Sequence, residues 1–168
     1  MEVAFCPKCG TQEIQFSRNK LFCNNCDFVL YQNTAAAVAV LLKHGNEILF
    51  TVRNQQPGLG LLDLPGGFCD PEESAEQTCK REILEELQLN LEENKFRYLG
   101  SRPNIYPYKN VIYNTMDLFY EYELSEKPSA TLQKKEISGI EWVEATKIDL
   151  SKLAFESQQL FLAQYFGI

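Results

Sequence analysis

Residues 66–89, GGFCDPEESAEQTCKREILEELQL, contain six glutamates and one aspartate. Like charges three or four positions apart on a helix repel each other, at a cost of roughly 0.2–0.5 kcal/mol per pair. A folded chain that keeps so many carboxylates together therefore needs something to compensate their charge. This requirement constrains both the fold and the function of the chain.

The same stretch contains signals for the start of a helix. Asp70 suits the N-cap, Pro71 suits the first helical position, and Glu73 falls where a capping box places its acidic side chain. The pattern predicts a helix from this point to about Leu89.

Glu82, Glu85 and Glu86 fall on one face of the predicted helix, at 100° per residue. Carboxylates grouped in this way suit Mg²⁺ or Mn²⁺, which prefer oxygen ligands, waters and substrate phosphates. The alternative is a solvated acidic face, which is the usual explanation of a charge run.

The order of residues decides between these interpretations. Gly67 is followed after five residues by Glu73, and after seven more by residues 81–86, REILEE. This order resembles the Nudix hydrolase signature, G-x5-E-x7-R-E-U-x-E-E-x-G-U, where U is apolar. Gln88 stands where the signature has glycine, which predicts a strained or displaced helix end, with Asn90 as the alternative turn residue.

The resemblance implies an α+β fold, an αβα sandwich with a mixed sheet, and hydrolysis of a nucleoside diphosphate linked to another moiety. It implies that Arg81 and Glu73 orient the helix and the loop that contains Gly66 and Gly67, here called the glycine loop. By position, the implied ligands of catalytic Mg²⁺ or Mn²⁺ are Glu82, Glu85 and Glu86.

Glu136 is the expected further metal ligand from outside the signature. It stands six residues before Trp142, a spacing like that in zinc-ribbon Nudix enzymes. The alternative is an exposed glutamate beside Lys134 and Lys135.

Residues 1–33 form a predicted first domain with two C-x-x-C pairs. Between the pairs, a short hairpin with a turn at 18–20 is expected. Four thiolates leave no open coordination position, so a structural zinc ribbon is favoured over a catalytic zinc, and the balanced charges of the segment disfavour nucleic-acid binding. The predicted Zn²⁺ ligands are Cys6, Cys9, Cys23 and Cys26.

Residues 34–168 form the predicted Nudix domain. A hairpin is expected from 35–43 and 47–53 around a turn at 44–46, with further strands and connecting loops within 96–108, 111–124 and 137–148. A final amphipathic helix at 155–166 is expected to point Leu160, Phe161 and Tyr165 inward.

A zinc ribbon directly before a Nudix domain resembles the NADH pyrophosphatase branch. Residues 101–109, SRPNIYPYK, match about half of the motif S-Q-P-W-P-F-P-x-S of that branch. Tyr106 could stack on a nucleobase or belong to the core, and Arg53 and Arg102 could contact a phosphate or ribose or be ordinary surface residues. The predicted substrate-binding residues are Arg53, Gly66, Gly67, Arg102 and Tyr106.

The net charge of −7 argues against general attraction to nucleic acid or to anionic membranes. No apolar run approaches the roughly 18 residues of a membrane span, and residues 1–10 do not resemble a secretion signal, so a cytoplasmic location is expected.

The functional hypothesis is a Mg²⁺-dependent or Mn²⁺-dependent pyrophosphohydrolase that releases AMP from an adenine dinucleotide or nucleotide sugar, such as NADH, ADP-ribose or FAD. One alternative is a regulatory Nudix domain that binds a nucleotide without cleaving it. Another is an RNA-cap hydrolase, which would require a basic approach path. The resemblance also suggests a homodimer.

Overall fold

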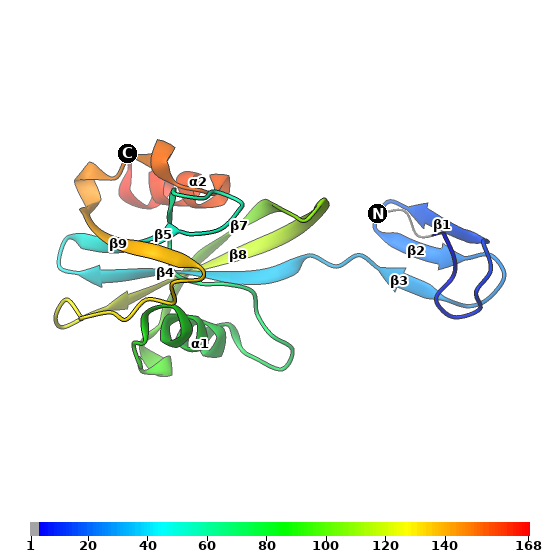
Figure 1. Ribbon diagram of the computed structural model, residues 1–168, viewed down its shortest axis with the longest axis horizontal. Coiled ribbons are helices and arrows are strands. Elements are labelled where there is room, and N and C mark those ends of the chain that lie inside the picture. The colour runs from blue at the N-terminus through cyan, green and yellow to red at the C-terminus, as the bar shows by residue number, and fades with distance from the viewer. Residues whose placement is uncertain (1–3) are drawn as a thin grey trace. The chain divides into compact units, whose positions relative to one another are not determined.

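The computed structural model describes residues 4–168, which divide between residues 34 and 35 into two compact units. Figure 1 shows the elements of both units. No helix among the described residues has the length and apolar character needed to cross a bilayer.

The first unit is a three-stranded antiparallel sheet in the order β1-β2-β3. Its strands are β1 (Ile14–Ser17), β2 (Lys20–Cys23) and β3 (Val29–Tyr31). The predicted hairpin is confirmed, whereas β3 was not predicted. Within residues 4–34 the buried side chains are Cys6, Leu21 and Cys23, which is too little apolar surface to stabilise an independent fold.

The second unit is built on a six-stranded mixed sheet in the order β6-β5-β4-β8-β7, with β9 also paired to β5. β4 is parallel to β8, and the other pairs are antiparallel. The strands are β4 (Ala35–His44), β5 (Glu47–Arg53), β6 (Leu62–Asp63), β7 (Arg97–Tyr108), β8 (Val111–Glu123) and β9 (Ile137–Glu144).

Two helices cover the faces of this sheet, α1 (Ala75–Leu87) on one side and α2 (Glu156–Phe166) on the other (Figure 1). Ile83 and Leu87 of α1 are fully buried, each contributing roughly 1.5–3 kcal/mol of transfer free energy. On the other face, Phe161 stacks on Phe119 with ring centroids 3.9 Å apart. The predicted α+β fold, an αβα sandwich with a mixed sheet, is confirmed.

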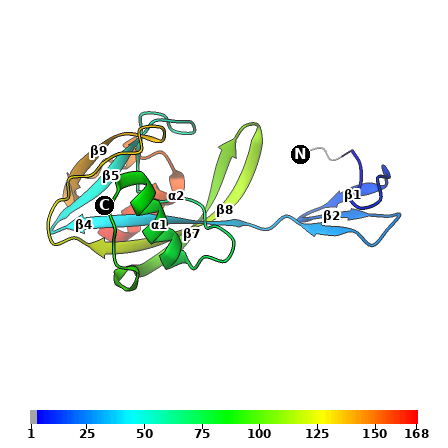
Figure 2. The same ribbon diagram turned by 60° about the horizontal axis from the view of Figure 1, so that its bottom comes forward.

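Short 3₁₀ turns complete the unit at Glu93–Lys95, Ala145–Lys147 and Leu150–Lys152. The paired ends of β7 and β8 extend beyond the rest of the sheet (Figure 2).

β4 and β5 separate along part of their length, and this separation positions the functional site. They pair only between 42–44 and 47–49, next to their turn. Nearer the N-terminal end of β4, residues 65–69 pair with β4 where β5 does not. Val38 N–H donates to Gly67 O at 2.8 Å, and Val40 N–H donates to Pro65 O at 2.9 Å. Gly66 and Gly67 therefore lie against the middle of β4, where β4 and β5 are no longer paired.

Helix α1 begins later than the sequence predicted. Its N-cap is Ser74, whose Oγ accepts a hydrogen bond from Gln77 N–H, while the Gln77 side chain accepts one from Ser74 N–H. Glu72 has a φ of 71°, a left-handed conformation that a right-handed helix starting at Asp70 could not include. Asp70 as N-cap is therefore wrong, and a Ser-x-x-Gln capping box four residues later starts the helix.

The end of α1 explains how the chain tolerates Gln88. Gln88 itself adopts the left-handed conformation, with φ of 57° and ψ of 32°, so Asn90 is not needed for the turn. This conformation costs a non-glycine residue roughly 1–2 kcal/mol. Two hydrogen bonds to Leu84 O offset part of that cost, one from the backbone N–H at 3.0 Å and one from Nε2 at 2.9 Å.

The expected inward face of α2 is partly wrong. Phe161 is buried, but Leu160 is 54% exposed and Tyr165 is 37% exposed. The buried face instead includes Ser157 and Gln158, whose side chains hydrogen bond to aspartates of the sheet. Because these polar residues are satisfied inside the protein, apolar periodicity alone misplaced the helix face.

Candidate active site

A cavity opens where β4 and β5 separate, bounded by the glycine loop and by α1. Of the predicted site residues, the structure brings together in this cavity Arg53, Gly66, Gly67, Glu82, Glu86, Tyr106 and Glu136.

Glu86 is the most enclosed carboxylate of the signature, with 8% of its surface exposed. Its Oε2 accepts a hydrogen bond from Gly66 N–H at 3.2 Å. Burial, and then the neighbouring charges of Asp63 and Glu82, raise the pKa of Glu86 well above its ordinary value. A cation in the cavity would remove this penalty.

Glu82 lies against the glycine loop, and its side chain is 13% exposed. Burial raises the pKa of Glu82, although Arg81 Nη1 donates a hydrogen bond to Oε1 at 2.7 Å. A Cβ atom on Gly67 would lie 2.5 Å from the same oxygen. A side chain at position 67 would therefore displace the Glu82 carboxylate from its present position.

Gly66 is required for a different reason. Its φ of 151° is disfavoured for residues with a side chain, and a Cβ would lie 2.1 Å from Val38 O. The two glycines thus hold the loop against β4 while the Gly66 amide points at Glu86.

Arg81 and Glu73 brace the site from outside the cavity. Arg81 forms a two-pronged ion pair with Glu73, at 2.9 and 3.0 Å, and its Nη2 donates to Phe68 O at 2.9 Å. The hydrogen bonds from Arg81 lower the pKa of Glu73 to about 2. These contacts tie α1 to the segment that directly follows the two glycines.

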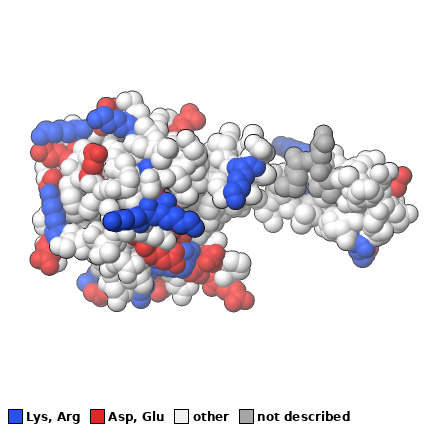
Figure 3. Space-filling view, in the orientation of Figure 1, with Lys and Arg blue, Asp and Glu red and all other residues white. Residues whose placement is uncertain are grey.

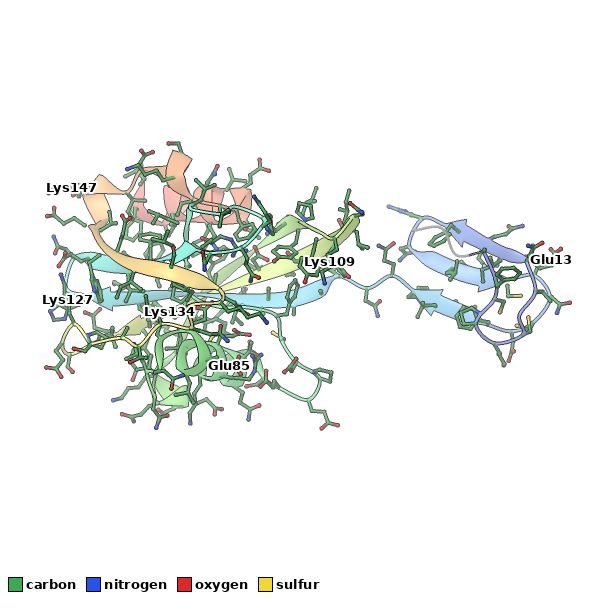
Figure 4. All side chains as sticks on the ribbon, viewed as in Figure 1. Glu13, Glu85, Lys109, Lys127, Lys134 and Lys147 are labelled. Carbon is green, nitrogen blue, oxygen red and sulfur yellow. The ribbon has the colours of Figure 1, made fainter. Side chains whose placement is uncertain are left out.

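The other two predicted metal ligands differ in position. Glu136 lines the cavity, where the loop before β9 passes. Glu85 lies on α1 (Figure 4) and is not among the residues that line the cavity. Its side chain is 51% exposed, and one of its oxygens lies 3.4 Å from Arg81 Nη1.

The lining carboxylates fit a divalent cation that keeps part of its water shell. Glu82, Glu86 and Glu136 offer hard oxygen ligands within one cavity. Among the described residues, only the four cysteines bring three or more ligand atoms to a common point. Mg²⁺ is usually held by one or two carboxylates, several waters and substrate phosphates, which is compatible with this looser arrangement.

Arg53 is the one lysine or arginine among the described residues that line the cavity. It forms an ion pair with Asp63, and its Nε donates to Pro57 O at 2.6 Å. Its guanidinium lies 4.9 Å from the ring centroid of Phe155. These contacts fix a positive charge in a cavity otherwise rich in carboxylates.

Asp63 and Gln158, which support Arg53, were not predicted from the sequence as site residues. Gln158 Nε2 donates to Asp63 Oδ1 at 2.5 Å, and Gln158 Oε1 accepts from Leu64 N–H at 3.1 Å. Asp63 stands directly before the LPGG segment, which was the available signal, whereas Gln158 gave none.

Arg102 is not part of this cavity. Its guanidinium hydrogen bonds to the Gln164 side chain, and it lines a separate hollow beside Tyr165. Tyr106, four residues along the same strand, does line the cavity.

The cysteine cluster in the first unit has the geometry of a closed zinc site. The Sγ atoms of Cys6 and Cys26 are 3.8 Å apart, those of Cys9 and Cys23 are 3.7 Å apart, and all four lie within 4.8 Å of one another. Tetrahedral coordination with Zn–S bonds of about 2.3 Å places sulfurs roughly 3.8 Å apart.

The sandwich, the glycine loop and the carboxylates of α1 together define a domain of the Nudix type. A family model described as NUDIX domain matches residues 32–165. The chain belongs to this family, which confirms the resemblance stated from the sequence.

Relatives and solved structures give the same result. The chain is 30% identical over 142 residues to the NAD-capped RNA hydrolase NudC of Haemophilus influenzae (strain PittGG), covering 82% of this chain and 50% of NudC. The chain thus spans about half the length of the curated relatives it matches.

Two solved structures share the fold. A NUDIX hydrolase from Nitrosomonas europaea superposes with a TM-score of 0.70 at 20% identity, covering 98% of this chain and 91% of that one. The NUDIX domain of Shewanella oneidensis NrtR, complexed with ADP ribose, superposes with a TM-score of 0.64 at 24% identity, covering 82% and 91%.

Proposed function

We propose that this chain is a divalent-cation-dependent pyrophosphohydrolase that cleaves an adenine dinucleotide or nucleotide sugar and releases AMP. The observation that carries the proposal is the cavity that combines Glu82, Glu86 and Glu136 with the fixed guanidinium of Arg53. Such a cavity suits a pyrophosphate whose oxygens contact both the bound cations and the guanidinium of Arg53.

Some residues of the chain would bind the cation, and others would orient the substrate or the glycine loop. Glu82, Glu86 and Glu136 would hold Mg²⁺ or Mn²⁺, and Glu85 would contribute through water from the exposed side of α1. When bound, the cation neutralises phosphate oxygens and lowers the pKa of the attacking water. Arg53 would orient the pyrophosphate, and Arg81 with Glu73 would fix the position of the glycine loop relative to α1.

The names of similar proteins support the substrate class. NAD and ADP-ribose, which occur in the names of a relative and of a structural neighbour, both contain an adenosine diphosphate group. The retained carboxylates favour turnover over a purely regulatory role. A capped RNA would present the same bond, but the net charge of −7 and the mixture of acidic and basic side chains on the face shown in Figure 3 favour a small nucleotide.

The first unit is proposed to hold one structural zinc ion through Cys6, Cys9, Cys23 and Cys26. The sulfur spacing supports this assignment, and the small number of buried side chains explains why the ribbon requires a metal.

A substrate panel tests the proposed activity. The protein is incubated with Mg²⁺ and separately with NADH, ADP-ribose, FAD and nucleoside triphosphates, and the products are separated by chromatography. We expect AMP from at least one dinucleotide or nucleotide sugar. Cleavage of triphosphates alone would contradict the substrate class and leave the family assignment intact.

A further inference from the structure

A buried aspartate outside the Nudix signature also lines the cavity. Asp117, on β8, is 7% exposed. None of the ion pairs formed within residues 4–168 involves it. Aspartate is rarely buried without a paired charge, so this side chain requires an explanation that the proposed chemistry does not supply.

The hydrogen bonds of Asp117 fix its orientation without using all its capacity. Oδ1 accepts from Thr115 Oγ1 at 2.8 Å, and Oδ2 accepts from Ser157 Oγ at 2.6 Å. An ionised carboxylate has about four acceptor positions. Asp117 can therefore accept further hydrogen bonds from a ligand in the cavity.

Three aromatic side chains that line the same cavity contact one another in series, and together they are called the aromatic wall. The ring centroids of Phe68 and Tyr106 are 5.5 Å apart, and those of Tyr106 and Phe155 are 5.7 Å apart. A ring inserted between two others needs roughly 7 Å, twice the usual carbon contact distance. Phe68 stands edge-on to Tyr106, with an interplanar angle of 89°, whereas Tyr106 and Phe155 are tilted by 34°. These rings are too close together to enclose another ring, so a ligand ring would stack on an outer face of one of them.

The strand register places the aromatic wall and Asp117 on one surface. On β7, Asn104 is paired with Thr115, and Arg102 is paired with Asp117. Directly paired residues share a face, as do residues two apart, so Asn104 lies between Tyr106 and Asp117 on the cavity side. Phe155, two residues before Ser157, joins the two regions from the α2 side.

We propose that Asp117, assisted by Asn104, is the specificity determinant for an amine-bearing ring, the adenine of the substrate, stacked on the Phe68–Tyr106–Phe155 wall. The carboxylate accepts a hydrogen bond from the exocyclic amino group. A ring with an oxygen at that position directs lone pairs at the carboxylate and is rejected. This inference rests on the proposed function, because the ring belongs to the nucleotide that is hydrolysed.

The test compares AMP with IMP, in which an oxygen replaces the amino group. Neither contains a pyrophosphate bond, so calorimetric affinities in Mg²⁺ are independent of turnover. We expect the wild-type protein to bind AMP about 10-fold or more tightly than IMP. In Asp117→Asn the preference for AMP over IMP should fall below about 3-fold or reverse, because the amide can donate a hydrogen bond to the exocyclic oxygen of IMP.

Tyr106→Leu provides the matched control. It removes stacking and should weaken AMP and IMP by similar factors, leaving their ratio as in the wild type. If thermal melting shows that Asp117→Asn does not fold, Asn104→Ala is expected to reduce the AMP preference. Equal binding of AMP and IMP by the wild type, or an unchanged ratio in a folded Asp117→Asn or Asn104→Ala protein, would overturn the inference. Failure of the proposed function would appear separately, as absence of pyrophosphate cleavage.

Discussion

Glu86→Gln should reduce turnover of the proposed substrate by roughly 100-fold or more while leaving the fold intact. The neutral amide is a much poorer ligand for a hard divalent cation. It also removes a buried charge that nearby Asp63 and Glu82 disfavour, so the cation-free variant should unfold at the same temperature as the wild type or higher. Steady-state kinetics and thermal melting measure both effects.

Glu76→Gln is the matched control for this prediction. Glu76 is on the same helix, but it accepts a hydrogen bond from Tyr120 Oη at 2.8 Å and does not line the cavity. It should keep near-normal turnover. Mg²⁺ should raise the melting temperature of the wild type and of Glu76→Gln, but not that of Glu86→Gln. Near-normal turnover in a folded Glu86→Gln protein would refute the metal assignment.

Replacing Cys23 with serine should release zinc from the first unit. The wild-type protein is expected to carry about one tightly held zinc per chain, and the variant should carry far less, because three cysteines cannot close a tetrahedral site. Loss of the metal should also unfold residues 4–34, whose buried side chains include Cys23 itself. Elemental analysis and limited proteolysis measure the two consequences.

Cys69→Ser controls for the loss of a thiol as such. Cys69 is half-buried in the second unit and is not a member of the four-cysteine cluster. This variant should retain the zinc content of the wild type. The absence of zinc from carefully prepared wild-type protein would rule out the proposed ribbon site.

The sequence predicted the parts of the site that depend on local spacing. The Gly67-to-Glu86 pattern predicted Glu82 and Glu86 as site residues, and both line the cavity, because helix periodicity and the glycine loop are local properties. Glu85 was grouped with the others by the same periodicity, yet the helix turns its side chain to solvent. A regular 100° pattern cannot reveal which edge of a helix face borders a cavity.

The parts that escaped prediction depend on contacts between distant segments. Leu64 and Asp63 hydrogen bond with Gln158, and Asp117 with Ser157, joining β6 and β8 to the last helix. Ser157 and Gln158 are polar but buried, so the apolar pattern that was used to point Leu160 inward could not locate the buried face of α2. Arg102 and Arg53 were equivalent candidates until the fold separated them.

Hydrolysis of ADP-ribose in ¹⁸O-labelled water tests the proposed cleavage of the pyrophosphate, since it identifies the bond that breaks. With Mg²⁺ present, we expect AMP and ribose 5-phosphate, with one ¹⁸O atom in the phosphate group of one of them. Fragmentation mass spectrometry reads the phosphates separately from the anomeric oxygen of ribose, which exchanges with water. Release of free adenine, inorganic phosphate or unphosphorylated ribose, with no ¹⁸O in the phosphate of AMP or of ribose 5-phosphate, would contradict cleavage within the pyrophosphate.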